Sequence, residues 1–167
     1  MTKEAGPWVA ILMGSGSDAP YIAPCEEVLQ SYGIPYEARV LSAHRAPDET
    51  AGYLKEAESR GIEVIIAAAG MAAHLAGAAA AYTILPVIGI PVASGPLNGV
   101  DALYSTVMMP PGLPVATVAI NGAANAGHLA AETLRGAHPE LGDRIRRQRQ
   151  AQRQKVLEAD ASIKRHY

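Results

Sequence analysis

Short apolar runs alternate with longer stretches of mixed polarity along the 167-residue chain. Apolar runs of strand length, bounded by Gly, Pro or polar residues, predict β-strands at 8–13, 36–41, 64–69, 86–90 and 115–120. The first and third of these runs are apolar at every position. That pattern is typical of strands that are covered on both faces of a sheet.

The intervening stretches predict helices at 17–32, 47–60, 73–82, 99–107, 123–135 and 139–158. Ser17 suits the N-cap of the first helix, and Pro47 suits the first position of the second. Pro24 does not suit a helix interior, so we expect the first helix to start late or to bend there. We expect a loop from Pro91 to Asn98.

This alternation of strands and helices predicts an α/β fold, with a parallel sheet of about five strands and helices on both faces. The length corresponds to about one domain. We therefore expect a single domain over 1–167, with the core at 7–137, a C-terminal helix at 138–160 and a tail at 161–167.

Composition narrows the possible partners. The chain is 49% hydrophobic and 18% charged and contains no Phe, so small aliphatic side chains must fill the core. The formal net charge of −2 argues against nucleic-acid binding, although basic residues gather between 144 and 155. No signal peptide or membrane-spanning run is evident, so we expect a cytoplasmic protein with no membrane partner. The lone Cys25 falls within a predicted helix and is interpreted as a buried spectator.

The segments that carry polar chemistry directly follow predicted strands. They are Gly-Ser-Gly-Ser-Asp at 14–18, Ser-Ala-His-Arg at 42–45, Gly-Met-Ala-Ala-His at 70–74 and Pro-Val-Ala-Ser-Gly at 91–95. In open α/β sheets, ligands bind outside the carboxyl ends of the strands. We therefore expect these loops to form one site.

The first of these loops suits a phosphate. Ser15 and Ser17 offer hydroxyls, and the following helix offers free backbone N–H groups. Asp18 suits ribose hydroxyls, or it simply caps the helix, in which case the loop is a turn with no ligand. The loose pattern Gly-x-Gly-x-x-Ala is weak evidence for a dinucleotide site, and no acidic residue ends the second strand as such a site requires.

The second and third loops each contain a histidine. His44 can exchange protons near neutral pH, and the adjacent Arg45 can hold a phosphate or a carboxylate. His74 lies among small residues that allow a substrate close to the backbone. Either histidine could instead have a purely structural role. Without an acidic cluster, they make a poor metal site, so we expect no metal.

Several motifs in a fixed order resemble the PurE family, the phosphoribosylaminoimidazole carboxylases of purine biosynthesis. The resemblance covers about 9–158. It rests on Met-Gly-Ser-Gly-Ser-Asp at 13–18, Ser-Ala-His-Arg-Ala-Pro-Asp at 42–48, Ala-Ala-His-Leu at 72–75, Gly-Ile-Pro-Val at 89–92, Gly-Val-Asp-Ala-Leu at 99–103 and Met-Pro-Pro-Gly-Leu-Pro-Val-Ala-Thr at 109–117.

The resemblance implies a flavodoxin-like three-layer α/β/α sandwich and a homo-octamer whose active sites form where subunits meet. It implies a nucleotide substrate and no cofactor, with His44 transferring the proton at the imidazole carbon. The implied substrate-binding residues are Ser15, Ser17 and Asp18 around the ribose phosphate, Ser42 and Arg45 on the nucleotide, and Gly70, Ala73, His74 and Leu75 in the carboxyl pocket.

The family has two branches. One moves a carboxyl group from the exocyclic nitrogen to the ring carbon, and the other adds carbon dioxide directly. Arg45 and His74 resemble the first branch, whereas Met71, Ala76 and Met108 depart from its usual Gly, Pro and Gln. We therefore expect a mutase, with the direct carboxylase as the alternative.

A flavodoxin-like binding module without chemistry is a further alternative. The low aromatic content, 5% of residues, argues against a flavin, which usually stacks on aromatic side chains. A phosphate-acceptor signalling domain would need clustered acidic residues at the strand ends, which Asp18 alone does not supply.

Overall fold

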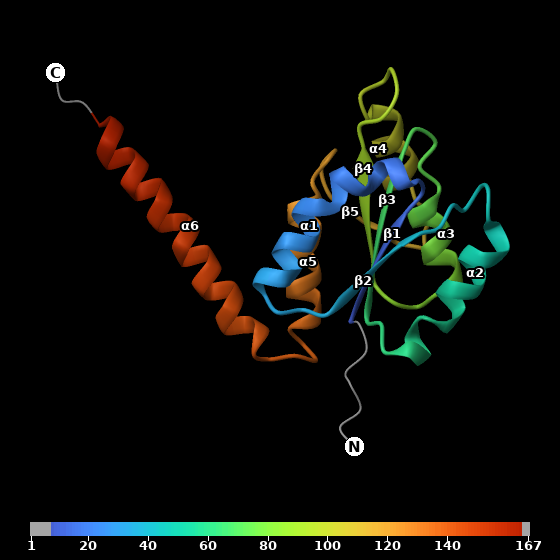
Figure 1. Cartoon of the computed structure of the whole chain (residues 1–167), viewed down its shortest axis with the longest axis horizontal. Coiled ribbons are helices and arrows are strands. Elements are labelled where there is room, and N and C mark those ends of the chain that lie inside the picture. Colours follow the sequence, from blue (N-terminus) through green and yellow to red (C-terminus); the bar gives the residue numbers. More distant parts are fainter. Residues whose placement is uncertain (1–7, 165–167) are drawn as a thin grey trace.

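The computed structural model describes residues 8–164 and contains a five-stranded parallel sheet (Figure 1). The strands lie in the order β2-β1-β3-β4-β5, as in flavodoxin-like folds. Their bounds are β1 (Val9–Met13), β2 (Tyr36–Val40), β3 (Val64–Gly70), β4 (Val87–Val92) and β5 (Ala116–Thr117). The predicted α/β class and sheet are confirmed.

The apolar runs explain which strands are central. Every residue of β1 and β4 is buried, and the two strands flank β3 in parallel register, with Val9 opposite Val64 and Ile66 opposite Ile88. Alternate side chains enter opposite faces of the sheet: Ile11 joins one core and Leu12 the other. The sheet is therefore covered on both sides.

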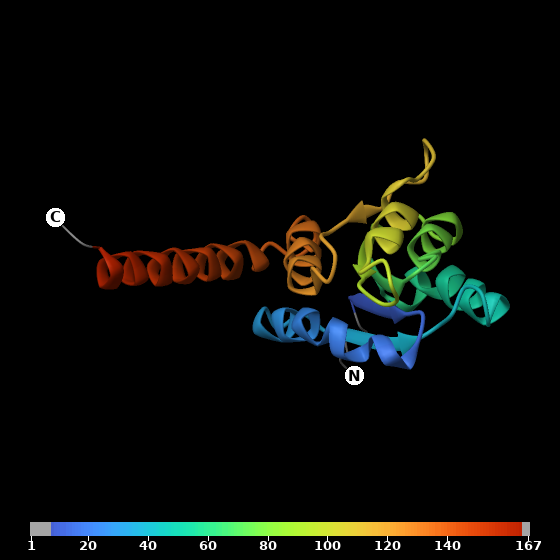
Figure 2. The ribbon, with the colours of Figure 1, turned by 90° about the horizontal axis from the view of Figure 1, so that it is seen from above.

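Helices form the outer layers (Figures 1 and 2). On one face lie α1 (Ala19–Ser31) and α5 (Ala123–Leu134), which pack closely because a Cβ on Gly127 would lie 2.9 Å from Val28. The other face carries α2 (Pro47–Glu56), α3 (Leu75–Tyr82) and α4 (Val100–Val107). The sandwich thus has three layers, as predicted.

The long helix α6 (Leu141–Ile163) leaves the sandwich and projects away from it (Figures 1 and 2). Only its first turns are buried, at Leu141, Gly142 and Ile145. The turn before α6 is held by His138, whose ring stacks on Trp8 with centroids 3.7 Å apart and whose Nε2 lies 2.7 Å from Glu63. No helix within 8–164 is long and apolar enough to cross a membrane.

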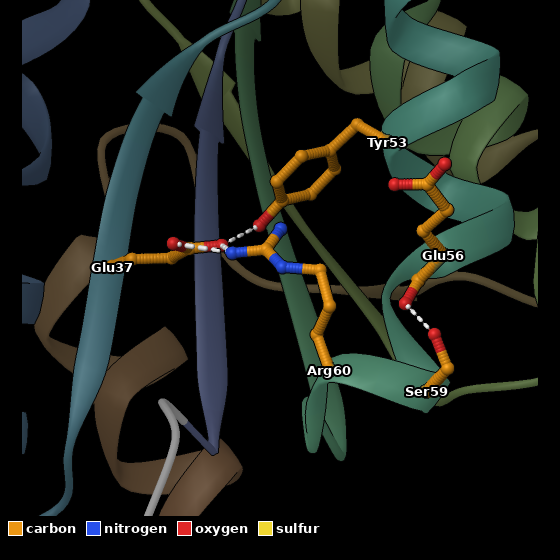
Figure 3. Close-up of polar contacts among 5 residues, drawn as sticks. All are labelled: Glu37, Tyr53, Glu56, Ser59 and Arg60. Carbon is orange, nitrogen blue, oxygen red and sulfur yellow. Dashed lines mark hydrogen bonds and ion pairs between the residues drawn. The ribbon is translucent and has the colours of Figure 1, made fainter.

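The exposed edge strand β2 is tied to the helix layer by a polar cluster (Figure 3). The hydroxyl of Tyr53, on α2, donates to Glu37 of β2 at 2.5 Å. The guanidinium of Arg60, from the short 3-10 helix η2 (Glu58–Arg60), donates to both carboxylate oxygens of Glu37 at 2.7 and 2.8 Å. This cluster supplies the edge strand with partners that its sequence alone does not reveal.

Several predicted boundaries are wrong. The fourth strand continues through Pro91 and Val92, where we expected a loop, because these two residues pair with Ala69 and Gly70 of β3. The fifth strand is two residues long instead of spanning 115–120, because regular pairing with β4 stops at Thr117 and, within residues 8–164, only the N–H groups of Val118 and Asn121 bond to β4 beyond it. Helix α1 does not start after Pro24, since it begins at Ala19 and contains that proline, and the alternative of a bend at Pro24 stays a prediction.

Candidate active site

The loops that follow β1, β2, β3 and β4 meet at the carboxyl edge of the sheet, around a cavity of about 510 Å³. Strand order reverses between β1 and β3, which is where ligands bind in flavodoxin-like sheets. The lining residues are Gly14, Ser15, Ser17, Asp18, Ser42, Ala43, His44, Arg45, Ala69, Gly70, Met71, Ala72, His74, Leu75 and Ser94.

All of the predicted site residues except Ala73 line this cavity. Ala73 is buried, and its N–H donates to the carbonyl of Met71 at 2.9 Å, so it supports the loop from behind. Six further residues line the cavity that were not predicted as site residues: Gly14, Ala43, Ala69, Met71, Ala72 and Ser94. Of these six, Ser94 alone carries a hydroxyl. Its hydroxyl follows the fourth strand as those of Ser15 and Ser42 follow theirs, and that shared position was the available signal.

The first loop is a rigid turn that presents two hydroxyls. The short 3-10 helix η1 (Gly16–Asp18) is closed by a capping box: Ser15 Oγ accepts the N–H of Ser17 at 3.3 Å, and Asp18 Oδ2 accepts the N–H of Ser15 at 3.0 Å. Ser17 Oγ donates to Ser15 Oγ at 2.9 Å. One carboxylate oxygen of Asp18 therefore serves as a cap.

The environment of Asp18 affects its charge. The residue is only 6% exposed, and burial raises the pKa of its carboxyl above the usual value. The N–H of Ser15 and the positive charge of Arg45 act in the opposite direction on that pKa. A buried carboxyl beside an arginine is a polar group that a ligand hydroxyl could also reach.

Arg45 ties the second loop to the first. Its Nη2 donates to the carbonyl oxygen of Gly14 at 2.7 Å, and its Nε donates to Ser42 Oγ at 3.2 Å. Within residues 8–164 it makes no ion pair with a carboxylate, and its side chain is exposed at the cavity. A guanidinium held by neutral oxygens keeps donors and a positive charge available for an anionic ligand.

The histidines of the second and third loops come together. The rings of His44 and His74 stack with centroids 5.0 Å apart and an interplanar angle of 26°. Both side chains are exposed to the cavity. An imidazole at this position can give or take a proton at a bound ligand.

The third loop packs tightly against the segment after β4. A Cβ on Gly70 would lie 1.8 Å from Ser94 Oγ, so any larger residue would force Ser94 to move. The next residue, Met71, has a φ of +55° and a side chain that is 57% exposed. The third loop is therefore in direct contact with the segment after β4.

A larger cavity, of about 840 Å³, lies at the other end of the sheet, near the start of β4. Its charged residues are Lys55 and Glu58, and no histidine lines it. The side chains suited to proton transfer and anion binding therefore lie in the smaller cavity. In the part of the chain that the structure describes, no group of three His, Cys, Asp or Glu side chains could hold a metal ion, and the expected lack of a metal stays a prediction.

Comparisons with known proteins agree with this arrangement. A family model described as AIR carboxylase matches residues 8–155. The N5-carboxyaminoimidazole ribonucleotide mutase of Thermotoga maritima is 53% identical over 152 residues, covering 91% of this chain and 89% of that relative. The mutase of Saccharolobus solfataricus is 54% identical over 151 residues, covering 90% and 96%. The crystal structure of Treponema denticola PurE superposes with a TM-score of 0.87 at 32% identity, covering 95% of this chain and 99% of that one.

Proposed function

The chain belongs to the AIR carboxylase family, and on that premise we propose that it is an N5-carboxyaminoimidazole ribonucleotide mutase of purine biosynthesis. The resemblance seen in the sequence motifs is thereby confirmed. The observation that carries the proposal is the meeting of His44, Arg45 and the hydroxyls of Ser15 and Ser17 in one cavity. Such a cavity combines an anion site with a proton-transfer group.

The polar groups suit a ribonucleotide. Ser15 and Ser17, at the start of the first helical segment, would hold the phosphate together with Arg45. Asp18 and Ser42 would bind ribose hydroxyls, since Asp18 keeps acceptor capacity beyond its bond to Ser15, and Ser42, which accepts from the N–H and Nε of Arg45, keeps its own O–H as a donor. Gly70, His74 and Leu75 would surround the carboxyl group.

The reaction would proceed in two steps. The bond between the exocyclic nitrogen and the carboxyl carbon breaks, its electron pair stays on nitrogen, and nitrogen takes up a proton. The ring carbon then forms a bond to the carbon dioxide held in the cavity and loses its own proton. His44 would give the first proton and accept the second, so the sum is an isomerisation. Exclusion of water matters because the trapped carbon dioxide must recombine before it escapes.

The choice between the two branches rests on Arg45 and His74, which resemble the mutases, and on the mutase names of relatives about half identical to this chain. Met71, which lines the cavity, and Ala76, which is buried one residue beyond Leu75, depart from the usual mutase residues. The experiment must therefore distinguish the mutase from the direct carboxylase, which is the competing function.

We propose further that the protein is a single-domain homo-octamer of the cytoplasm. Two surfaces support association: α6 is exposed over most of its length, and one side of α4 exposes Val100, Tyr104, Val107 and Met108. Light scattering should report eight subunits at micromolar concentration. A monomer there would refute the octamer.

The test of the mutase proposal has two arms. One supplies the N-carboxy nucleotide in buffer stripped of bicarbonate, and the other supplies the uncarboxylated nucleotide together with bicarbonate. The N-carboxy nucleotide alone should yield the 4-carboxy product. Product that forms only from the uncarboxylated nucleotide plus bicarbonate, in proportion to dissolved carbon dioxide, would identify a direct carboxylase.

A further inference from the structure

Met71 adopts a backbone conformation that its side chain disfavours. Its φ of +55° lies in the left-handed region, which glycine enters freely and a long side chain does not. Such positions persist where the surrounding structure holds them, and they cluster at functional sites. The neighbouring Gly70 is closely packed, because a Cβ there would lie 1.8 Å from Ser94 Oγ and 3.2 Å from the carbonyl oxygen of Val92.

The side chain of Met71 lies at the mouth of the cavity. It reaches the segment after β4, where a Cβ on Gly95 would lie 3.5 Å from Met71 Cγ. It is 57% exposed, and among residues 8–164 it is the one large exposed apolar side chain that lines this cavity. The opposite walls carry hydroxyls, the Arg45 guanidinium and the stacked imidazoles of His44 and His74.

We propose that Met71 is the lid of the site: its thioether side chain folds over the bound nucleotide and keeps carbon dioxide in the cavity between the two chemical steps. This inference rests on the proposed mutase function. Met71 is then a positioning residue that sets the fraction of turnovers ending in product rather than in escape of carbon dioxide.

Three physical properties favour this role. The apolar side chain of Met71 is exposed in the single chain and would be buried by a ligand. Methionine is unbranched and flexible, so it can fit an irregular gap, and its sulfur makes favourable contacts with flat rings. The left-handed backbone directs the side chain toward Gly95, whose lack of a side chain leaves room for it.

Substitutions at position 71 separate the side chain from the backbone. Met71→Ala removes the lid and keeps the disfavoured φ, Met71→Gly removes both, and Met71→Leu keeps an apolar side chain of similar size. Ile84→Ala is the control, because Ile84 is 89% exposed and lies outside this cavity. For each protein, the ratio of uncarboxylated nucleotide to 4-carboxy product is measured after subtraction of the enzyme-free rate, together with Tm.

We expect Met71→Ala and Met71→Gly to raise the ratio of uncarboxylated nucleotide to 4-carboxy product about tenfold. That factor corresponds to about 1.4 kcal/mol. Met71→Leu and Ile84→Ala should stay near the wild type, and Met71→Gly should melt no lower than Met71→Ala. Unchanged ratios in folded Ala and Gly variants would overturn the lid while leaving the mutase function intact. A wild type that consumes no N-carboxy nucleotide would overturn both proposals.

Discussion

Two arginines of this protein lie in contrasting surroundings. Arg60 donates to both carboxylate oxygens of Glu37 and stands over the ring of Tyr53, with the guanidinium carbon 5.0 Å from the ring centroid (Figure 3). Arg45 donates to Ser42 Oγ and to the carbonyl of Gly14, both neutral oxygens. The first charge is neutralised within the fold, and the second is held in place without being neutralised.

The difference separates a structural cluster from a binding cluster. Glu37, Tyr53 and Arg60 come from β2, α2 and η2, so their contacts join the edge strand to the helix layer. Arg45 joins loops at the cavity and keeps donors for a ligand. Removal of the first cluster should lower stability, and removal of the second should lower activity.

The largest effect is expected inside the binding cluster, at His44. His44→Asn should fold and assemble as the wild type does, because the imidazole ring of His44 is exposed and stacks on the exposed ring of His74. Loss of a positioned acid/base should lower kcat by about 10²–10⁴-fold. Turnover of the N-carboxy nucleotide checks this, and near-normal kcat in the folded variant would remove His44 from the proposed mechanism.

The same substitution at the two arginines tests the contrast directly. Arg45→Met should raise KM for the nucleotide about 10–100-fold, the usual worth of hydrogen bonds to a charged group, with little change in Tm. Arg60→Met should leave KM unchanged and lower the free energy of unfolding by about 0.5–2 kcal/mol, since it leaves Glu37 with the Tyr53 hydroxyl as its one side-chain partner. Steady-state kinetics and urea unfolding measure both. If the two variants behaved alike, the contrast would be wrong.

A smaller effect is expected at Tyr53. Burial, followed by the hydrogen bond to Glu37, raises the pKa of the phenol, so the hydroxyl stays a donor at physiological pH. Tyr53→Phe should lower the free energy of unfolding by about 0.5–1.5 kcal/mol, because Glu37 keeps its bonds to Arg60. Urea titration measures the change, and altered kcat or KM would show that the structural cluster reaches the cavity.

The smallest effect is a pH dependence at Asp18. Burial raises the pKa of this carboxyl above the ordinary value of 3.8, so its ionisation opposes folding as pH rises. The stability that the protonated carboxyl of Asp18 contributes is fully present below pH 3.8. It is lost as the pH rises through the pKa that Asp18 has in the folded protein. Asp18→Asn should therefore gain in relative stability across that range, while it weakens nucleotide binding at neutral pH. Unfolding of both proteins from pH 3 to 7 tests the sign, and a constant difference would contradict it.

The sequence predicted the parts of the fold that local pattern determines. The run at 64–69 is apolar throughout and lies in a buried strand, and the loops after the strands meet because parallel strands end at one edge. The ends of elements depended on contacts distant in sequence. Pro91 lies within β4 because it pairs with Ala69 of β3, a contact between residues far apart in the sequence.

Within the site, the sequence predicted which residues take part but not how their side chains are oriented. The sequence left Asp18 open between a cap and a ribose contact, and its bond to the Ser15 N–H shows that it caps. The inward or outward direction of a residue in a tight turn depends on backbone torsions, which explains why Ala73 lies behind the loop. The stacking of His44 on His74 joins residues of different loops and has no local signal.

The central claim is that the carboxyl group migrates without leaving the cavity. The direct measurement supplies N5-carboxyaminoimidazole ribonucleotide carrying a ¹³C-labelled carboxyl, in buffer with excess unlabelled bicarbonate, and follows the label by mass spectrometry. A mutase whose cavity retains carbon dioxide should place most of the ¹³C in the 4-carboxy product. Product that carries mainly unlabelled carboxyl would show that the group exchanges with solution and would contradict the account.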